Sequence, residues 1–230
     1  MSTSTLSRPD RRTATLVVVS HGHGQEHTGP DFEIPEWAAR WAGSSGWELH
    51  RYTNGGPGAA AAAAGPGARA LLLRPGTPAS ARQEQKRRPH VVAAVAAMPD
   101  DGAVVADAVE FADAVGAALT FVHAVPCSFG ERSVDLAGAL ARGQRLLDTA
   151  ACAAEALSEG LSPLTQLLRV RPHELVGEAL DADLLVIGGP RTGHRDPWGE
   201  HRSSVQPGGL GLVAHSALHH APCPVLLTPR

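Results

Sequence analysis

From residue 90 onward, short apolar runs alternate with longer amphipathic stretches. Between the runs, apolar residues recur three or four positions apart, which is the spacing of a helix that buries one face. Strands separated by helices predict an α/β domain whose open, doubly wound, parallel five-stranded sheet is covered by helices. The five predicted strands are 90–97, 119–125, 164–170, 183–189 and 225–227.

Helices are expected at 103–117, at 134–159, in a short segment that begins at Pro172, and at 212–220. Pro222 prevents the last helix from continuing into the final strand. The first helix is divided into two faces. They consist of apolar Val104, Ala108, Phe111 and Val115, and of acidic Asp107, Glu110 and Asp113 on the opposite side.

Residues 13–76 show part of the same order with fewer elements. An apolar run at 13–24, a short helical stretch at 35–46 and two further short strands resemble the opening β-turn-α-β of the second half. So short a segment cannot supply five strands and four helices. We therefore interpret 13–76 as an abbreviated, degenerate repeat that depends on contacts with the second half for its stability. Residues 77–89 are interpreted as a polar linker and 90–230 as the full domain.

Composition excludes several classes of protein. A net charge of -3 gives no basic footprint for nucleic acid or for an anionic membrane. No window approaches the length of a membrane span or of a secretory leader, so we expect a cytoplasmic protein. Three cysteines without a CxxC pair indicate neither a disulfide framework nor a zinc knuckle.

Three segments of the second half resemble the universal stress protein family. They are FVHAV at 121–125, ADLLVIGG at 182–189 and HSALHHAPCPVLL at 215–227. The resemblance covers 90–230 and implies the fold of the adenine nucleotide alpha hydrolases. It also implies a test for nucleotide binding, because members that bind nucleotides carry an Asp after the first strand and a glycine-rich loop after the fourth.

This sequence departs from that nucleotide signature. Ala96 stands at the position of the Asp, Arg191 at that of the second loop glycine and Leu212 at that of the Ser or Thr. Gly188 and Gly211 match the remaining glycines and are the candidate remnants of a cofactor-binding loop. We expect no cofactor in the usual mode; the alternative is a switch that still binds ATP through the altered loop. The basic residues of that loop either bind an anion or are ordinary solvated side chains. They are Arg191, His194, Arg195, His201 and Arg202.

Histidines suggest two further interpretations. His215 and His219 share one face of the last predicted helix, a spacing that zinc can use, but Ala217, Leu218 and Ala221 also make it an ordinary packed helix. We favour packing, with Cys223 as a small core residue and no metal. A second cluster, His21, His23 and His27, leaves open a metal- or phosphate-handling hydrolase.

The main hypothesis is a non-enzymatic stress-response or signalling protein that acts through protein contacts and has no catalytic residues. The resemblance implies that the final strand lies at an edge of the sheet that is used in subunit pairing. The short, Pro-flanked segment at 224–229 suits such pairing. Its partner is either the N-terminal half of the same chain or a second copy.

Overall fold

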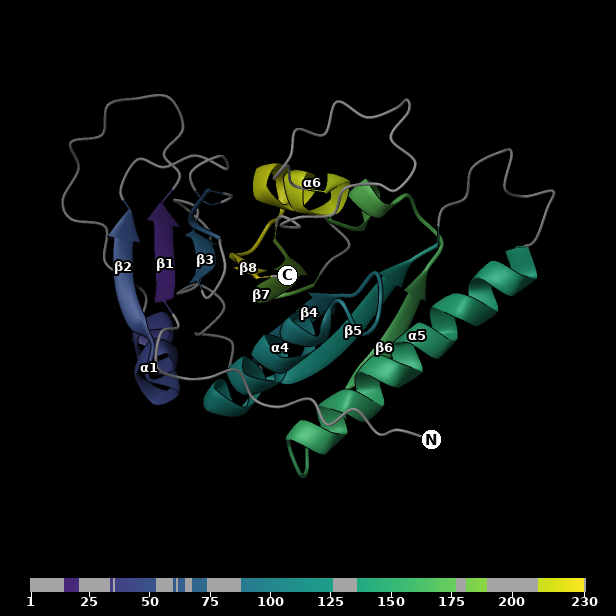
Figure 1. Ribbon diagram of the computed structural model, residues 1–230, viewed down its shortest axis with the longest axis horizontal. Coiled ribbons are helices and arrows are strands. Elements are labelled where there is room, and N and C mark those ends of the chain that lie inside the picture. The colour runs from purple at the N-terminus through teal and green to yellow at the C-terminus, as the bar shows by residue number, and fades with distance from the viewer. Residues whose placement is uncertain are drawn as a thin grey trace.

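The fold is an eight-stranded sheet with helices on both faces (Figure 1). The computed structural model describes residues 15–20, 34, 36–52, 60, 62–64, 68–73, 88–125, 136–176, 181–189 and 211–229. Within them the strand order is β2-β1-β3-β8-β7-β4-β5-β6. The strands are β1 (Thr15–Ser20), β2 (Glu48–Tyr52), β3 (Ala68–Leu73), β4 (His90–Ala94), β5 (Ala118–Ala124), β6 (Leu164–Leu168), β7 (Leu184–Gly188) and β8 (Val225–Thr228).

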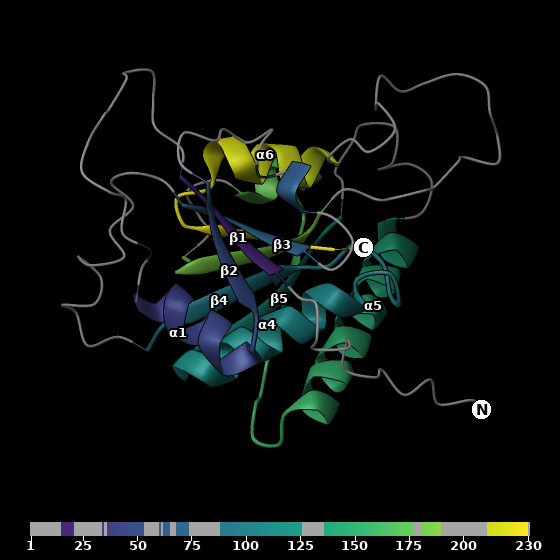
Figure 2. The same ribbon diagram turned by 60° about the vertical axis from the view of Figure 1, so that its left-hand side comes forward.

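The helices form two layers, one on each face of the sheet (Figures 1 and 2). One face is covered by α1 (Glu36–Ser45), α4 (Gly102–Val115) and α5 (Leu136–Leu157), and the other by the 3-10 helix η3 (Pro172–Val176) and by α6 (Leu212–His220). Alternate residues of a strand point to opposite faces, so Leu16 and Val18 pack with the first layer, and Val17 and Val19 with the second. None of the described helices is long and apolar enough to cross a membrane.

The predicted α/β class is therefore confirmed, but the five-stranded sheet is extended by three more strands. The predicted part is β8-β7-β4-β5-β6, with all of its neighbouring strands parallel. Strands β2, β1 and β3 of the first half form a parallel group that joins it at β8. The assignment of 13–76 as a degenerate repeat and of 77–89 as a linker stays a prediction, because much of both ranges lies outside the described residues.

The joint between the two groups is the one antiparallel pair among the described strands. Strand β3 pairs with β8, with Leu71 opposite Leu226 at the centre of the register. Both leucines are fully buried. The final strand therefore pairs with the N-terminal half of the same chain, which was one of the two predicted partners. It does not lie at an edge of the sheet, whose outer strands are β2 and β6.

A buried ion pair ties the first half to α4, and it corrects one prediction. Asp107 was expected on the polar face of its helix, but only 1% of its side chain is exposed. Arg69 of β3 donates to it twice, from Nε to Oδ2 and from Nη2 to Oδ1, each at 2.8 Å. The prediction was wrong because a helical pattern read within one domain does not show that another segment covers the polar face.

Aromatic residues surround this ion pair. The guanidinium of Arg69 lies 4.2 Å from the ring centroid of Trp47, a cation–π contact. Trp41 packs edge-on against both Trp47 and Phe111, with centroids 4.6 and 5.1 Å apart, and Trp37 packs edge-on against Phe111. Because Phe111 belongs to α4, these contacts give the two halves a common core.

Candidate functional site

The chain turns sharply after the carboxyl end of β4, where a carboxylate holds the turn. Oδ2 of Asp101 accepts hydrogen bonds from the backbone N–H of Ala96, at 2.6 Å, and of Ala97, at 3.0 Å. The Asp101 side chain is fully buried. Two backbone donors that point to this end of the sheet are thus already engaged within the protein.

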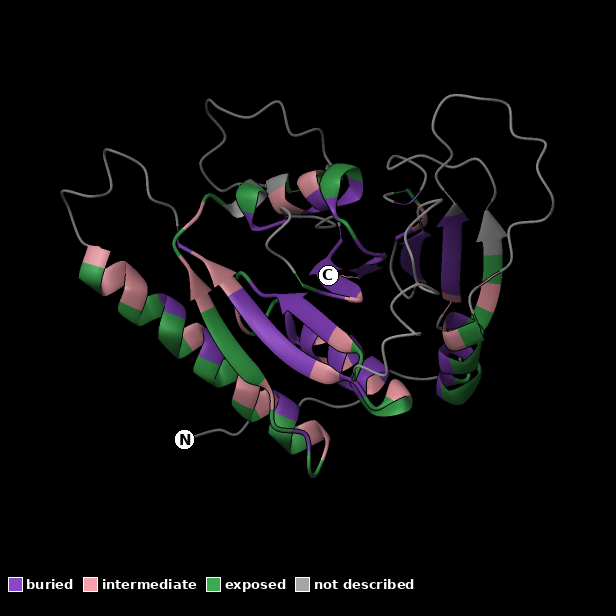
Figure 3. Cartoon of the chain, turned by 180° about the vertical axis from the view of Figure 1, so that it is seen from behind, coloured by how far each residue is buried: buried purple, intermediate pink, exposed green. Residues whose placement is uncertain are grey.

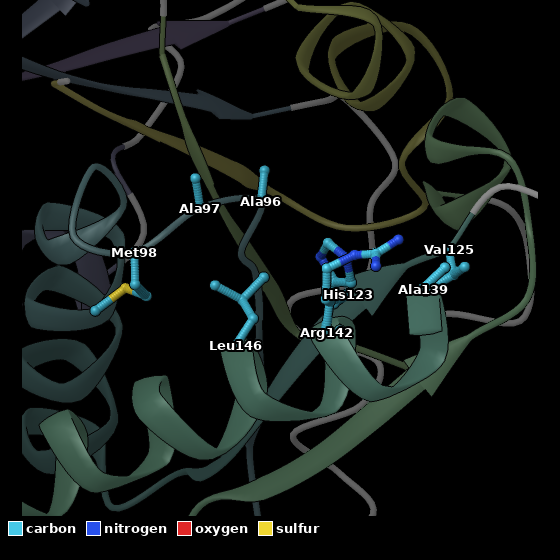
Figure 4. A pocket seen from close by; sticks show the side chains of 9 residues that line it. Ala96, Ala97, Met98, His123, Val125, Ala139, Arg142 and Leu146 are labelled. Atoms are coloured by element: carbon cyan, nitrogen blue, oxygen red, sulfur yellow. The ribbon is translucent and has the colours of Figure 1, made fainter. Parts of the chain in front are cut away.

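A pocket of about 380 Å³ opens beside this turn, between the carboxyl ends of β4 and β5 and the first half of α5 (Figure 4). Parallel α/β sheets commonly bind ligands at this end of their strands. The lining is mainly apolar, and none of the described residues that form it is acidic. It consists of Ala96, Ala97, Met98, His123, Val125, Ala139, Arg142, Gly143 and Leu146.

His123 and Arg142 supply the polar side chains of the pocket (Figure 4). Nδ1 of His123 lies 2.8 Å from the carbonyl oxygen of Val95. Because a carbonyl only accepts, Nδ1 donates this bond, and in the neutral ring Nε2 is left as an acceptor. The pocket thus pairs a cationic group with an imidazole of fixed orientation, an arrangement that favours an anionic or polar small molecule over an apolar one.

Gly143 allows α5 to approach the strands closely enough to form one wall of the pocket. A Cβ at this position would lie 2.7 Å from Cδ1 of Leu167, 3.0 Å from Cδ2 of His123 and 3.2 Å from Cγ2 of Val125. These contacts are tighter than side chains normally accept. Helical periodicity in the sequence does not identify Gly143 or Arg142 as pocket residues, because it does not show which end of a helix lies beside the end of a strand.

The two predicted remnants of a nucleotide loop do not line this pocket. Gly188 is the last residue of β7, and Gly211 precedes α6 with φ -62° and ψ 159°, a backbone conformation open to any residue. Gly189 has a stricter requirement, because its Cβ would lie 2.9 Å from the carbonyl oxygen of Thr228. The loop between these glycines, with its predicted anion-binding arginines and histidines, lies outside the described residues, as do His21, His23 and His27.

The last helix packs as predicted from its apolar positions. Ala217, Leu218, Ala221 and Cys223 are buried, whereas His215, His219 and His220 are exposed. Among the residues that the structure describes, no three His, Cys, Asp or Glu side chains come together as a metal site. The described cysteines, exposed Cys152 and buried Cys223, are both free thiols.

Comparison with solved structures gives alignments over part or all of the chain. A universal stress protein from Archaeoglobus fulgidus aligns at 24% identity and a TM-score of 0.47, over 64% of this chain and 97% of that one. A structure of the universal stress protein from the same organism in complex with dAMP aligns at 24% identity and a TM-score of 0.43, over 61% and 97%. Another, from Archaeoglobus fulgidus DSM 4304, aligns at 9% identity and a TM-score of 0.46, over 96% and 98%.

Comparison of the sequence with protein families gives a match that includes the pocket. No curated protein matches the chain. The model of the universal stress protein family, in contrast, matches residues 88–229, which contain β4 to β8 and every residue that lines the pocket. This match covers more than half of the chain, and the chain therefore belongs to the universal stress protein family.

Proposed function

We propose that the chain is a non-enzymatic signalling or stress-response protein that acts through protein contacts and whose nucleotide site is degenerate. The observation that carries the proposal is the turn after β4. Here Ala96 replaces the expected carboxylate, and Asp101 engages the backbone N–H groups of Ala96 and Ala97. A ligand at this turn meets the side chains of Ala96, Ala97 and Met98.

The loss of one carboxylate weakens binding substantially. A hydrogen bond to a charged group contributes about 1.5–3 kcal/mol, and each 1.4 kcal/mol changes affinity about tenfold. Asp101 cannot replace the missing group, because its carboxylate is buried beneath the turn and already accepts two hydrogen bonds there. We therefore expect adenine nucleotides to bind in the millimolar range or more weakly.

Calorimetric titration of the full-length chain with ATP, ADP and AMP tests this proposal. No saturable heat is expected at up to about 1 mM nucleotide, which corresponds to a binding free energy no better than about -4 kcal/mol. Saturation in the low micromolar range with any of the three would overturn the proposal. Thermal unfolding with and without ATP provides a second readout, because a bound ligand raises the midpoint.

A second candidate, a nucleotide-responsive switch, is favoured by one feature of the pocket. The pocket keeps a volume of about 380 Å³ and a cationic side chain, Arg142. We propose that a small anion uses this charge, because opposite charges attract most strongly where water is partly excluded. If the titration does detect binding, Arg142→Gln should weaken it at least about tenfold, whereas exposed Arg145→Gln on the same helix should leave it unchanged.

The arrangement of the sheet limits where protein contacts can form. Strand β8 already pairs with β3, so self-association through β8 would require β3 to leave that edge. We therefore propose that partners bind elsewhere on the molecule and that β8 does not join two copies. Light scattering of the full-length chain tests the second point: a monomer is expected, and a stable dimer at micromolar concentration would contradict it.

A further inference from the structure

Two histidine rings lie close together, tilted relative to each other, on the outer surface of α6. His215 and His219 are one helical turn apart, with ring centroids separated by 4.5 Å and planes inclined by 36°. Both are exposed, while Ala214, Ala217 and Leu218 bury the inner face of the helix. The packing of α6 against the sheet therefore does not depend on the two imidazoles, and both are accessible to ions in solution.

The geometry points to a metal site: we infer that His215 and His219 together bind one Cu²⁺ or Zn²⁺ ion through one ring nitrogen each. Imidazole is the commonest protein ligand of such ions. Two histidines four residues apart on one helical face is a spacing used for zinc. The helix fixes both backbones at this spacing, so only side-chain freedom is lost when the ion binds.

The site is open, which sets its expected strength and selectivity. Within the described part of the chain no third His, Cys, Asp or Glu joins the pair, so we expect water to complete the coordination of the ion. For divalent ions on nitrogen ligands, affinity follows the order in which Cu²⁺ exceeds Zn²⁺. We expect binding of moderate affinity, with Cu²⁺ bound more tightly than Zn²⁺.

His220 provides a matched control. Its ring centroid is 6.0 Å from that of His219, it is equally exposed, and it belongs to the same helix. Consecutive residues of a helix do not face each other, and His220 is five positions from His215, so His220 lacks the spacing of three or four residues that would let it share an ion with either histidine. Comparing His220→Ala with His215→Ala or His219→Ala thus separates the effect of losing one exposed imidazole from the effect of losing the pair.

The test is a calorimetric titration of the full-length, untagged chain with CuCl₂ and with ZnCl₂. His21, His23 and His27 are replaced by Ala in the parent so that they cannot compete. Binding of one ion per chain is expected, weakened about tenfold or more by His215→Ala or His219→Ala and less than about twofold by His220→Ala. No saturable binding in the parent, or an equal loss in His220→Ala, would overturn the inference.

Electron paramagnetic resonance of the Cu²⁺ complex reports the ligands of the ion directly, and a change in protein stability alone would leave the spectrum unchanged. The parent should show hyperfine coupling to two ring nitrogens, and His215→Ala to one. Identical spectra from the two proteins would contradict the pair as the site. Circular dichroism melts verify that each variant is folded, which is expected because the substituted side chains are exposed.

Discussion

Asp107 illustrates how one buried charge depends on its partner. Its carboxylate and the Arg69 guanidinium are almost completely buried, and the two hydrogen bonds between them link β3 to α4. A buried pair of this kind adds little stability relative to apolar residues of the same shape, but removing one partner leaves a costly unpaired charge. The pair therefore matters mainly for how the two halves fit together.

Arg69→Met should lower the free energy of unfolding by about 3–5 kcal/mol near neutral pH, because it leaves the Asp107 carboxylate without its partner. Urea denaturation monitored by tryptophan fluorescence measures the change. Arg40→Met is the control, since the Arg40–Glu36 pair is exposed and contributes less than about 1 kcal/mol. Adding Asp107→Leu to Arg69→Met should recover most of the loss; equal effects of Arg69→Met and Arg40→Met would refute this account.

The same carboxylate predicts a dependence of stability on pH. Burial raises the pKa of Asp107 from its ordinary value of 3.8 to about 6, although the hydrogen bonds and charge of Arg69 act in the opposite direction. The folded state therefore holds the proton more tightly than the unfolded state, so this group's contribution to stability is complete below about pH 4 and is lost as the pH rises to about 6.

Urea denaturation of the wild type and of Asp107→Asn across this pH range measures that contribution. The difference in unfolding free energy, wild type minus variant, should increase as the pH falls from about 7 to about 4. Taking the difference cancels the titration of the other carboxyl groups. Parallel profiles for the two proteins would show that Asp107 does not titrate in this window.

Ala96 is the residue at which the proposed loss of nucleotide binding can be tested most directly. Ala96→Asp places a carboxylate at the pocket rim, where the family's nucleotide-binding members carry one, and should improve ATP affinity about tenfold or more. Ala96→Asn is the matched control, because it has the same shape without the charge and should gain less. If calorimetry finds no gain with Asp, the loop after β7 or the shape of the pocket has changed as well.

At the scale of elements, the close approach of α5 to β5 and β6 depends on Gly143. Gly143→Ala should destabilise the protein by about 1–3 kcal/mol, because the added methyl meets Leu167, His123 and Val125. Gly43→Ala in α1 is the control, since nothing lies within 4 Å of its Cβ and Ala favours a helix by up to about 1 kcal/mol.

Chemical denaturation should therefore give changes of opposite sign for these two substitutions. The comparison is informative because both replace a helical glycine with the same residue, so a difference between them reports the surroundings and not the intrinsic preference for a helix. A stabilised Gly143→Ala would mean that α5 does not approach the sheet as closely as the structure shows.

The sequence predicts most helices and strands because the apolar residues of each element recur with the spacing, or form a run of the length, that is typical of its type. Strands β4, β5, β7 and β8 are short apolar runs and α4 and α5 are long amphipathic ones, so length and period separate them. The alternation of apolar and polar residues at 164–170 is typical of a half-buried strand, yet Leu164 is 67% exposed. A strand's own pattern does not reveal that it lies at the edge of the sheet, because this depends on which strand comes next in space (Figure 3).

At the scale of the whole molecule, the features that sequence could not decide are contacts between distant segments. The β3–β8 pairing joins residues more than 150 positions apart. The sequence of the final strand indicates that it pairs with another strand, but it does not specify which one. Similarly, the pocket combines the ends of β4 and β5 with a glycine and an arginine from α5. The family resemblance predicts that Ala96 stands at the position of a carboxylate, but only the structure shows that Asp101 accepts hydrogen bonds from the adjoining backbone.

We propose that the turn after β4 does not bind an adenine nucleotide tightly. The most direct measurement is a set of ¹H–¹⁵N NMR spectra of the full-length chain with increasing ATP, followed at the amides of Ala96, Ala97 and His123. At up to about 1 mM ATP we expect no saturable shift of these signals, because the two alanine amides stay hydrogen-bonded to Asp101. Saturable shifts of all three at micromolar ATP would contradict it.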